Sequence, residues 1–139
     1  MIRDALLPEL ITRFPDRGFQ TTNSGSNTIG FFPAAHPDVG NLYIADDGDE
    51  ATLFIGDLTH LHFHFEAGEA GPEKRVANDV LEFLDELFAD RILIWKSRTM
   101  SGDGATPIEN ASFFAGIKPD DLTFVWSGPF TNPKSINAG

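Results

Sequence analysis

The chain has 139 residues, 41% of them hydrophobic and 22% charged, which suits one compact domain and is too short for two domains with full cores. We therefore expect a single domain over residues 1–139. Cysteine is absent, which excludes disulfides, iron–sulfur clusters, thiolate zinc sites and thiol nucleophiles. No apolar run approaches the roughly 20 residues of a membrane-spanning helix, and the first residues lack the apolar core of a signal peptide. These features predict a soluble cytoplasmic protein.

The negative charge is concentrated in one part of the chain. The formal net charge is −11, and residues 46–90 contain 13 of the 21 acidic residues against two basic ones, Lys74 and Arg75. Binding to nucleic acids or to anionic membranes depends on lysine and arginine, so we expect neither as a partner. The acidic segment either steers a basic protein partner or serves solubility alone.

The first predicted element is a helix over residues 4–14, in which apolar residues recur at helical spacing. Asp4 can cap this helix, Pro8 falls in or near its first turn, and Pro15 ends it. A polar loop over residues 20–28 follows. A short strand is then expected over residues 29–32.

Two turns predict the register of the next three strands. A two-residue turn at Asp47-Gly48 pairs Leu42 with Leu53, and a three-residue loop at residues 56–58 pairs Leu53 with Leu61. Side chains alternate between the faces of a strand, so one face of this sheet is apolar and is expected to be buried. The opposite face carries Tyr43, Ala45, Glu50, Thr52, Phe54, His60, His62, His64 and Glu66.

The clearest predicted helix runs over residues 71–89, with Gly71 as its cap and Pro72 at its first position. Short strands are expected over residues 92–97 and 122–126. Between them lies a long connection in which Phe113 and Phe114 are expected to pack onto the domain. Residues 127–139 lack periodicity and are expected to fray as a tail.

The element order is therefore α-β-β-β-β-α-β-β, which indicates an α+β fold. We expect a mostly antiparallel sheet of about five to six strands with both helices packed on one face. The other face of such a sheet can remain in contact with water, so it is the expected location of a site or an interface.

The alternating histidines of residues 60–64 suggest a metal site, because alternate residues of a strand share a face and imidazole is a common metal ligand. One ion cannot take all three histidines, since His60 and His64 are roughly 13 Å apart at Cα. Two of them plus Glu50 or His36 could hold zinc, with Glu50 or Glu66 as ligand or base. Alternatively, Glu50 and His64 form a cross-strand pair and the other histidines lie on an exposed face.

The aromatic residues suggest an interface on the same face. The chain has 16 aromatic residues, and the predicted register leaves Tyr43 and Phe54 away from the helices, with Trp95 or Trp126 added by strand alternation. The predicted interface consists of Tyr43, Thr52, Phe54, His62 and Trp95. Alternatively, the segment with Phe113 and Phe114 folds over this face and makes it a second core layer.

These observations favour a protein-interaction domain without enzymatic activity, of an adaptor-like or immunity-like kind. Such a domain would associate through its sheet face, either as a homodimer or with a basic protein partner. The alternative is a metal-binding protein or metal-dependent hydrolase that uses His60, His62, His64 and Glu50, with zinc as its ion.

Overall fold

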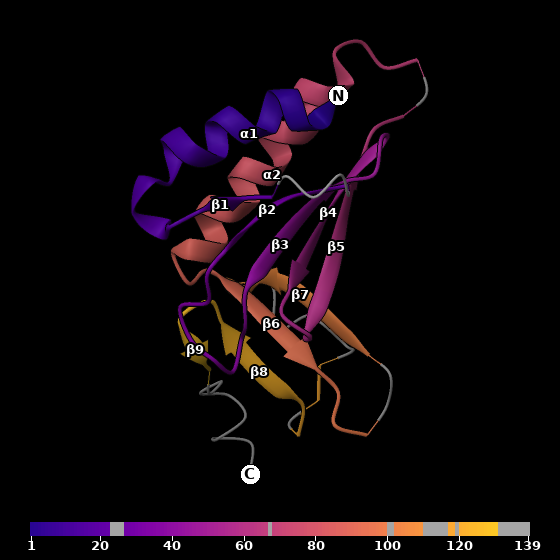
Figure 1. Ribbon diagram of the computed structural model, residues 1–139. Helices are drawn as coiled ribbons and strands as arrows, with labels where there is room; N and C mark the ends of the chain where they lie inside the picture. The colour runs from indigo at the N-terminus through magenta and orange to yellow at the C-terminus, as the bar shows by residue number, and fades with distance from the viewer. Residues whose placement is uncertain (23–26, 67, 100–101, 110–116, 119, 131–139) are drawn as a thin grey trace.

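The computed structural model describes residues 1–22, 27–66, 68–99, 102–109, 117–118 and 120–130. These residues contain two α-helices, a short 3-10 helix and nine strands (Figure 1). The bounds of the elements, in chain order, are α1 (Ile2–Arg13), η1 (Pro15–Arg17), β1 (Gln20–Thr21), β2 (Thr28–Phe32), β3 (Leu42–Asp46), β4 (Glu50–Ile55), β5 (Thr59–His64), α2 (Pro72–Phe88), β6 (Ile92–Lys96), β7 (Asp103–Pro107), β8 (Leu122–Val125) and β9 (Gly128–Pro129).

The strands form two antiparallel sheets. The first has the order β1-β2-β3-β4-β5, and α1 and α2 lie side by side on one of its faces (Figure 1). The second has the order β7-β6-β8-β9 and lies at the end of the first sheet where β4 turns into β5. The α+β class and the predicted element order are confirmed. The strands after α2 pair with one another in the second sheet and do not extend the first.

The register between β4 and β5 is the predicted one. Leu53 pairs with Leu61 and Glu50 pairs with His64, across a three-residue turn at residues 56–58. This register places every second residue of both strands on the helix-covered face. The sequence therefore predicted correctly which side chains of β5 point away from the helices.

The predicted register between β3 and β4 is wrong by two residues. Leu42 pairs with Ile55, not with Leu53, and Asp46 pairs with Ala51. The turn residues are Gly48 and Asp49, since Asp47 N–H donates to the Glu50 carbonyl at 2.9 Å. A turn at Asp47-Gly48 of the expected kind needs positive φ at both residues, whereas here Gly48 alone of the two has it, at 96°. A shift of two residues keeps every side chain on its predicted face.

The core lies between the first sheet and the two helices, and the second sheet closes one end of it. Fully buried side chains come from α1, β3, β4, α2 and β6, among them Leu6, Ile44, Leu53, Leu84 and Ile94. Burial of a Leu or Ile side chain contributes about 1.5–3 kcal/mol, so this cluster is the main source of stability. None of the helices in the described ranges is long and apolar enough to cross a membrane.

The first helix differs from the prediction in detail, whereas the second begins as predicted. α1 begins at Ile2, so Asp4 lies in its first turn and not at the cap, and Pro8 lies inside the helix. The first turn of α1 is instead bonded by the sheet, because Arg3 N–H donates to the buried Asp46 carboxylate at 3.0 Å. α2 begins at Pro72 after Gly71, which adopts a left-handed conformation as its cap.

The chain after α2 is more ordered than predicted over residues 127–130. Gly128 and Pro129 form β9 against β8, and Ser127 donates its hydroxyl hydrogen to Asp90 at 2.6 Å. Residues 131–139 lie outside the described residues, as do Phe113 and Phe114, so the predicted tail and the packing of those two rings stay predictions.

A close backbone contact supports the turn between β4 and β5. Gly56 and Gly40 both have positive φ, and their backbones touch, with Gly56 N–H donating to the Asn41 carbonyl at 2.8 Å. A Cβ atom on Gly56 would lie 2.0 Å from the carbonyl oxygen of Val39. Only glycine therefore fits at this position.

Gly56→Ala is expected to destabilise the fold far more than Gly48→Ala. Both positions have positive φ, which costs about 1–2 kcal/mol for a residue with a Cβ atom. Gly48 has open space around its Cα, whereas Gly56 meets backbone atoms, so overpacking adds about 1–3 kcal/mol at Gly56. Urea unfolding followed by circular dichroism measures both variants. Equal losses in the two would contradict the close contact.

Candidate functional site

The candidate site is the face of the first sheet that points away from the helices, which we call the open face. Cross-strand pairing places its side chains in rows. One row joins Phe31, Tyr43, Phe54 and His60 across β2, β3, β4 and β5, and we call it the aromatic row. The next row joins Ala45, Thr52 and His62, and beyond it Glu50 lies opposite His64.

The aromatic row is exposed to solvent at its centre. Tyr43 is 42% exposed and Phe54, its cross-strand partner, is 41% exposed. Phe31 packs on Tyr43 with ring centroids 5.2 Å apart, and Phe54 stacks on His60 at 5.8 Å. Two large exposed rings on neighbouring strands form a contiguous apolar patch, which is typical of a binding surface.

His62 is held by a hydrogen-bond network beside this row. Its Nδ1 atom lies 3.2 Å from Glu50 Oε1 and 3.2 Å from Thr52 Oγ1. The Thr52 hydroxyl donates its single hydrogen to Asp47 Oδ2 at 2.7 Å, so it can only accept from the imidazole. This assigns the ring proton to Nδ1 and directs Nε2 away from the network.

The three histidines do not converge. His60 and His62 meet edge to face, with ring centroids 5.1 Å apart, whereas His64 Nε2 lies 3.9 Å from Glu66, which follows the end of β5. His36 lies against Gly128 of the second sheet. Within the described ranges, no group of three His, Asp or Glu side chains is placed to hold a metal ion. The hypothesis of a site built from His60, His62, His64 and Glu50 therefore gains no support from the geometry. Although Glu50 lies opposite His64 in the strand register, its carboxylate contacts the imidazole of His62.

Three of the five predicted interface residues are exposed on the open face: Tyr43, Phe54 and His62. Thr52 is 2% exposed and lies beneath its neighbours, where it contributes a hydroxyl to the network and little contact area. Trp95 is not on this face, because it belongs to β6 of the second sheet and its indole covers Gly104. Trp126 is buried against Phe88. Sequence alternation could not show that β6 belongs to another sheet.

An expected tautomer tests the His62 network. At a pH where His62 is neutral, nitrogen NMR should find the proton on Nδ1, whereas a free imidazole prefers Nε2. A double variant with Glu50→Ala and Thr52→Val removes both acceptors and should restore the free preference. Glu66→Ala, which touches only His64, should leave His62 unchanged. A proton on Nε2 of the parent protein would contradict the assignment.

Arg75 of α2 lies beside the C-terminal end of β5. Its guanidinium bonds to Glu69, to Asp79 and to the His64 carbonyl. The hydrogen bond from Arg75 lowers the pKa of Glu69 below its ordinary value of 4.5, and the same bond raises the pKa of Arg75. This cluster links Glu69 and the end of β5 to the first half of α2.

Glu69 should add to the acid sensitivity of the fold. Because its pKa is lowered in the folded state, its contribution is present above about pH 4.5 and is lost as pH falls below that value. Glu69→Gln should therefore flatten the decline of the unfolding midpoint between about pH 5 and pH 3. Thermal unfolding at several pH values measures this. Parallel pH profiles for parent and variant would contradict the role of Glu69.

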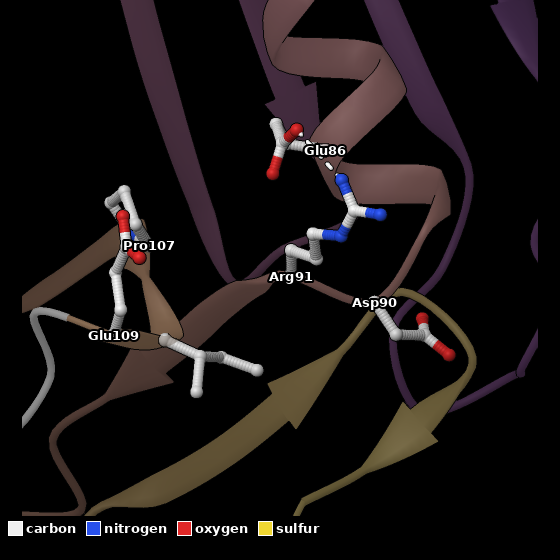
Figure 2. A pocket seen from close by; sticks show the side chains of 6 residues that line it. Glu86, Asp90, Arg91, Pro107 and Glu109 are labelled. Atoms are coloured by element: carbon white, nitrogen blue, oxygen red, sulfur yellow. Dashed lines mark hydrogen bonds and ion pairs between the residues drawn. The ribbon is translucent and has the colours of Figure 1, made fainter.

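Away from the open face, a hollow with a volume of about 230 Å³ lies between the end of α2 and β7 (Figure 2). Its lining includes Glu86, Arg91 and Glu109, and Arg91 pairs with Glu86 at 3.1 Å. Figure 2 shows the Asp90 carboxylate directed away from the carboxylates of Glu86 and Glu109, in agreement with its bonds to Ser127. Because Arg91 is already paired with Glu86 inside this hollow, it is a weaker candidate than the open face.

Arginines of the chain pair with the acidic residues of α2. Asp85 pairs with Arg13, Asp79 with Arg75 and Glu86 with Arg91. On the open face the partners are different: Asn27 and Thr52 donate to Asp47, and His62 contacts Glu50. Three of the five carboxylates of α2 therefore have an arginine partner, whereas Asp47 and Glu50 have none among the described residues.

Comparison with protein-family models, with curated proteins and with solved structures gives no match to this chain.

Proposed function

We propose that the protein is a binding module that docks another protein on the open face. The observation that carries this proposal is the pair of neighbouring rings, Tyr43 and Phe54, each more than two-fifths exposed at the centre of the face. Aromatic residues surrounded by polar groups are typical of the centre of a protein interface. An adaptor-like or immunity-like protein works in this way, because it binds its partner and catalyses no reaction.

The polar groups of the face support binding more than catalysis. An oriented imidazole such as His62 can act as a general base, but catalytic electrostatics depend on a site that excludes water. The His62 side chain is 48% exposed, and Glu50 beside it is 30% exposed. Both groups are accessible to a partner side chain.

Site-specific photo-crosslinking in cells of the source organism tests this proposal. A photoreactive benzoylphenylalanine is placed at Tyr43 or at Phe54, and the matched control carries it at Ile11, a large exposed residue of α1 (51%). We expect a covalent adduct of defined mass from positions 43 and 54 and none from position 11. Adducts of the same kind from all three positions, or from none, would overturn the proposal.

A further inference from the structure

We infer that the open face binds an arginine-bearing segment of the partner protein, an inference that rests on the proposed function. Three features of the face favour guanidinium groups: carboxylates without an arginine or lysine partner in the described part of the chain, exposed aromatic rings beside them, and an acidic hollow at the end of the same row. Each feature alone is common, and their arrangement along β4 and β5 is the argument.

The first feature is the charge left uncompensated on the face. Asp47 accepts from an amide and a hydroxyl, and Glu50 contacts an imidazole, whereas three acidic residues of α2 are paired with the chain's own arginines. A cationic side chain from a partner would therefore find accessible carboxylates on the open face. The net charge of −11 would also steer a cationic partner toward the protein from a distance.

The second feature is the stacking surface of Tyr43 and Phe54. Arginine stacks on aromatic rings through its planar guanidinium, more readily than lysine does. The chain already makes such a contact internally, because the guanidinium of Arg17 lies 4.7 Å from the ring centroid of Phe88. Phe54 and Glu50 share β4 and the same face. Their Cα atoms are therefore about 13 Å apart along the strand, which matches two arginines four residues apart in an extended peptide.

The third feature is a hollow of about 210 Å³ that continues the aromatic row past Phe54 and His60. Asp57 and Asp103 line it, and Thr59 donates to Oδ1 of Asp103 at 2.6 Å. One cation already lies near, since Lys96 donates to the Asp57 carbonyl oxygen at 2.9 Å. The hollow offers a carboxylate and an aromatic wall to the end of an arginine side chain. Carboxylates thus flank the exposed rings at both ends of β4.

A second copy of this chain fits the face less well. A symmetric pair would bring the same surface of both copies together, and the cross-strand rows of this face contain carboxylates but no lysine or arginine to meet them. Like charges in an interface oppose association. An arginine-bearing segment meets the same carboxylates with opposite charge.

The experiment uses defined peptides and the full chain. The probe is the capped hexapeptide Arg-Thr-Arg-Thr-Arg-Thr, in which three arginines share one face, and the comparators replace arginine by lysine or by glutamine. Binding is followed by amide NMR shifts at two salt concentrations. We expect shifts at Tyr43, Phe54, His60 and His62, an affinity for the lysine peptide about two- to fivefold lower, and no binding of the glutamine peptide.

Matched variants separate stacking from apolar contact and specific from general attraction. Phe54→Leu keeps an apolar side chain and should still weaken the arginine peptide about two- to fivefold, while Tyr43→Phe keeps the ring and should not. Glu50→Gln should weaken binding by a similar factor. Glu82→Gln removes the same charge from the exposed face of α2 and should change affinity by less than about 1.5-fold. Circular dichroism confirms that each variant is folded.

The outcomes are distinct. Binding of the glutamine peptide to the open face as tightly as the arginine peptide would overturn the inference and leave the proposed function standing, as would crosslinks at positions 43 and 54 without any arginine-peptide binding. Amide NMR shifts spread over α2, with equal losses of affinity in Glu82→Gln and Glu50→Gln, would mean that the peptide is attracted by the overall negative charge. This result would overturn the inference. A dimer by light scattering that Phe54→Ser dissociates would assign the face to a second copy and also overturn it.

Discussion

The close approach of Gly56 to Gly40 sets the geometry on which the open face depends. Because a side chain at Gly56 would overlap the Val39 carbonyl, the turn between β4 and β5 has little freedom, and its three residues fix Leu53 opposite Leu61. A register different by one residue would turn the histidines of β5 toward the helices and expose its apolar residues. The positions of the histidines of β5 relative to Phe54 and Glu50 of β4 therefore depend on this turn.

The distribution of ion pairs differs between α2 and the open face. Three acidic residues of α2 pair with arginines, of which Arg13 is distant in sequence and bonds to Asp85. The open face has a hydrogen-bond network instead, which orients Glu50 and His62, and neither Glu50 nor Asp47 has an arginine or lysine partner in the described part of the chain. Exposed ion pairs add little stability, so the main effect of this distribution is on where the remaining negative field lies.

Sequence reasoning was most accurate where the side-chain period decided the outcome. The faces of β3, β4 and β5 were predicted because alternation leaves one apolar assignment, and even the incorrect turn at Asp47-Gly48 preserved those faces. The second sheet was missed because β7, with the sequence Asp-Gly-Ala-Thr-Pro, has no alternation and is positioned by the Trp95 indole over Gly104. The contact of the Glu50 carboxylate with the imidazole of His62, and not with that of His64, was missed because side chains can reach diagonally between strands.

The sequence by itself determined the class of the fold, the extent of α2, the register of β4 against β5 and the exposure of Tyr43 and Phe54. These features depend on local rules: helix caps, period-two alternation and the conformational demands of a short turn. Only the tertiary structure decided where His36 lies, that Trp95 belongs to a second sheet and that Asp85 of α2 is paired with Arg13. Those contacts join residues far apart in the chain, and their distances depend on how sheets and helices pack, which no local pattern encodes.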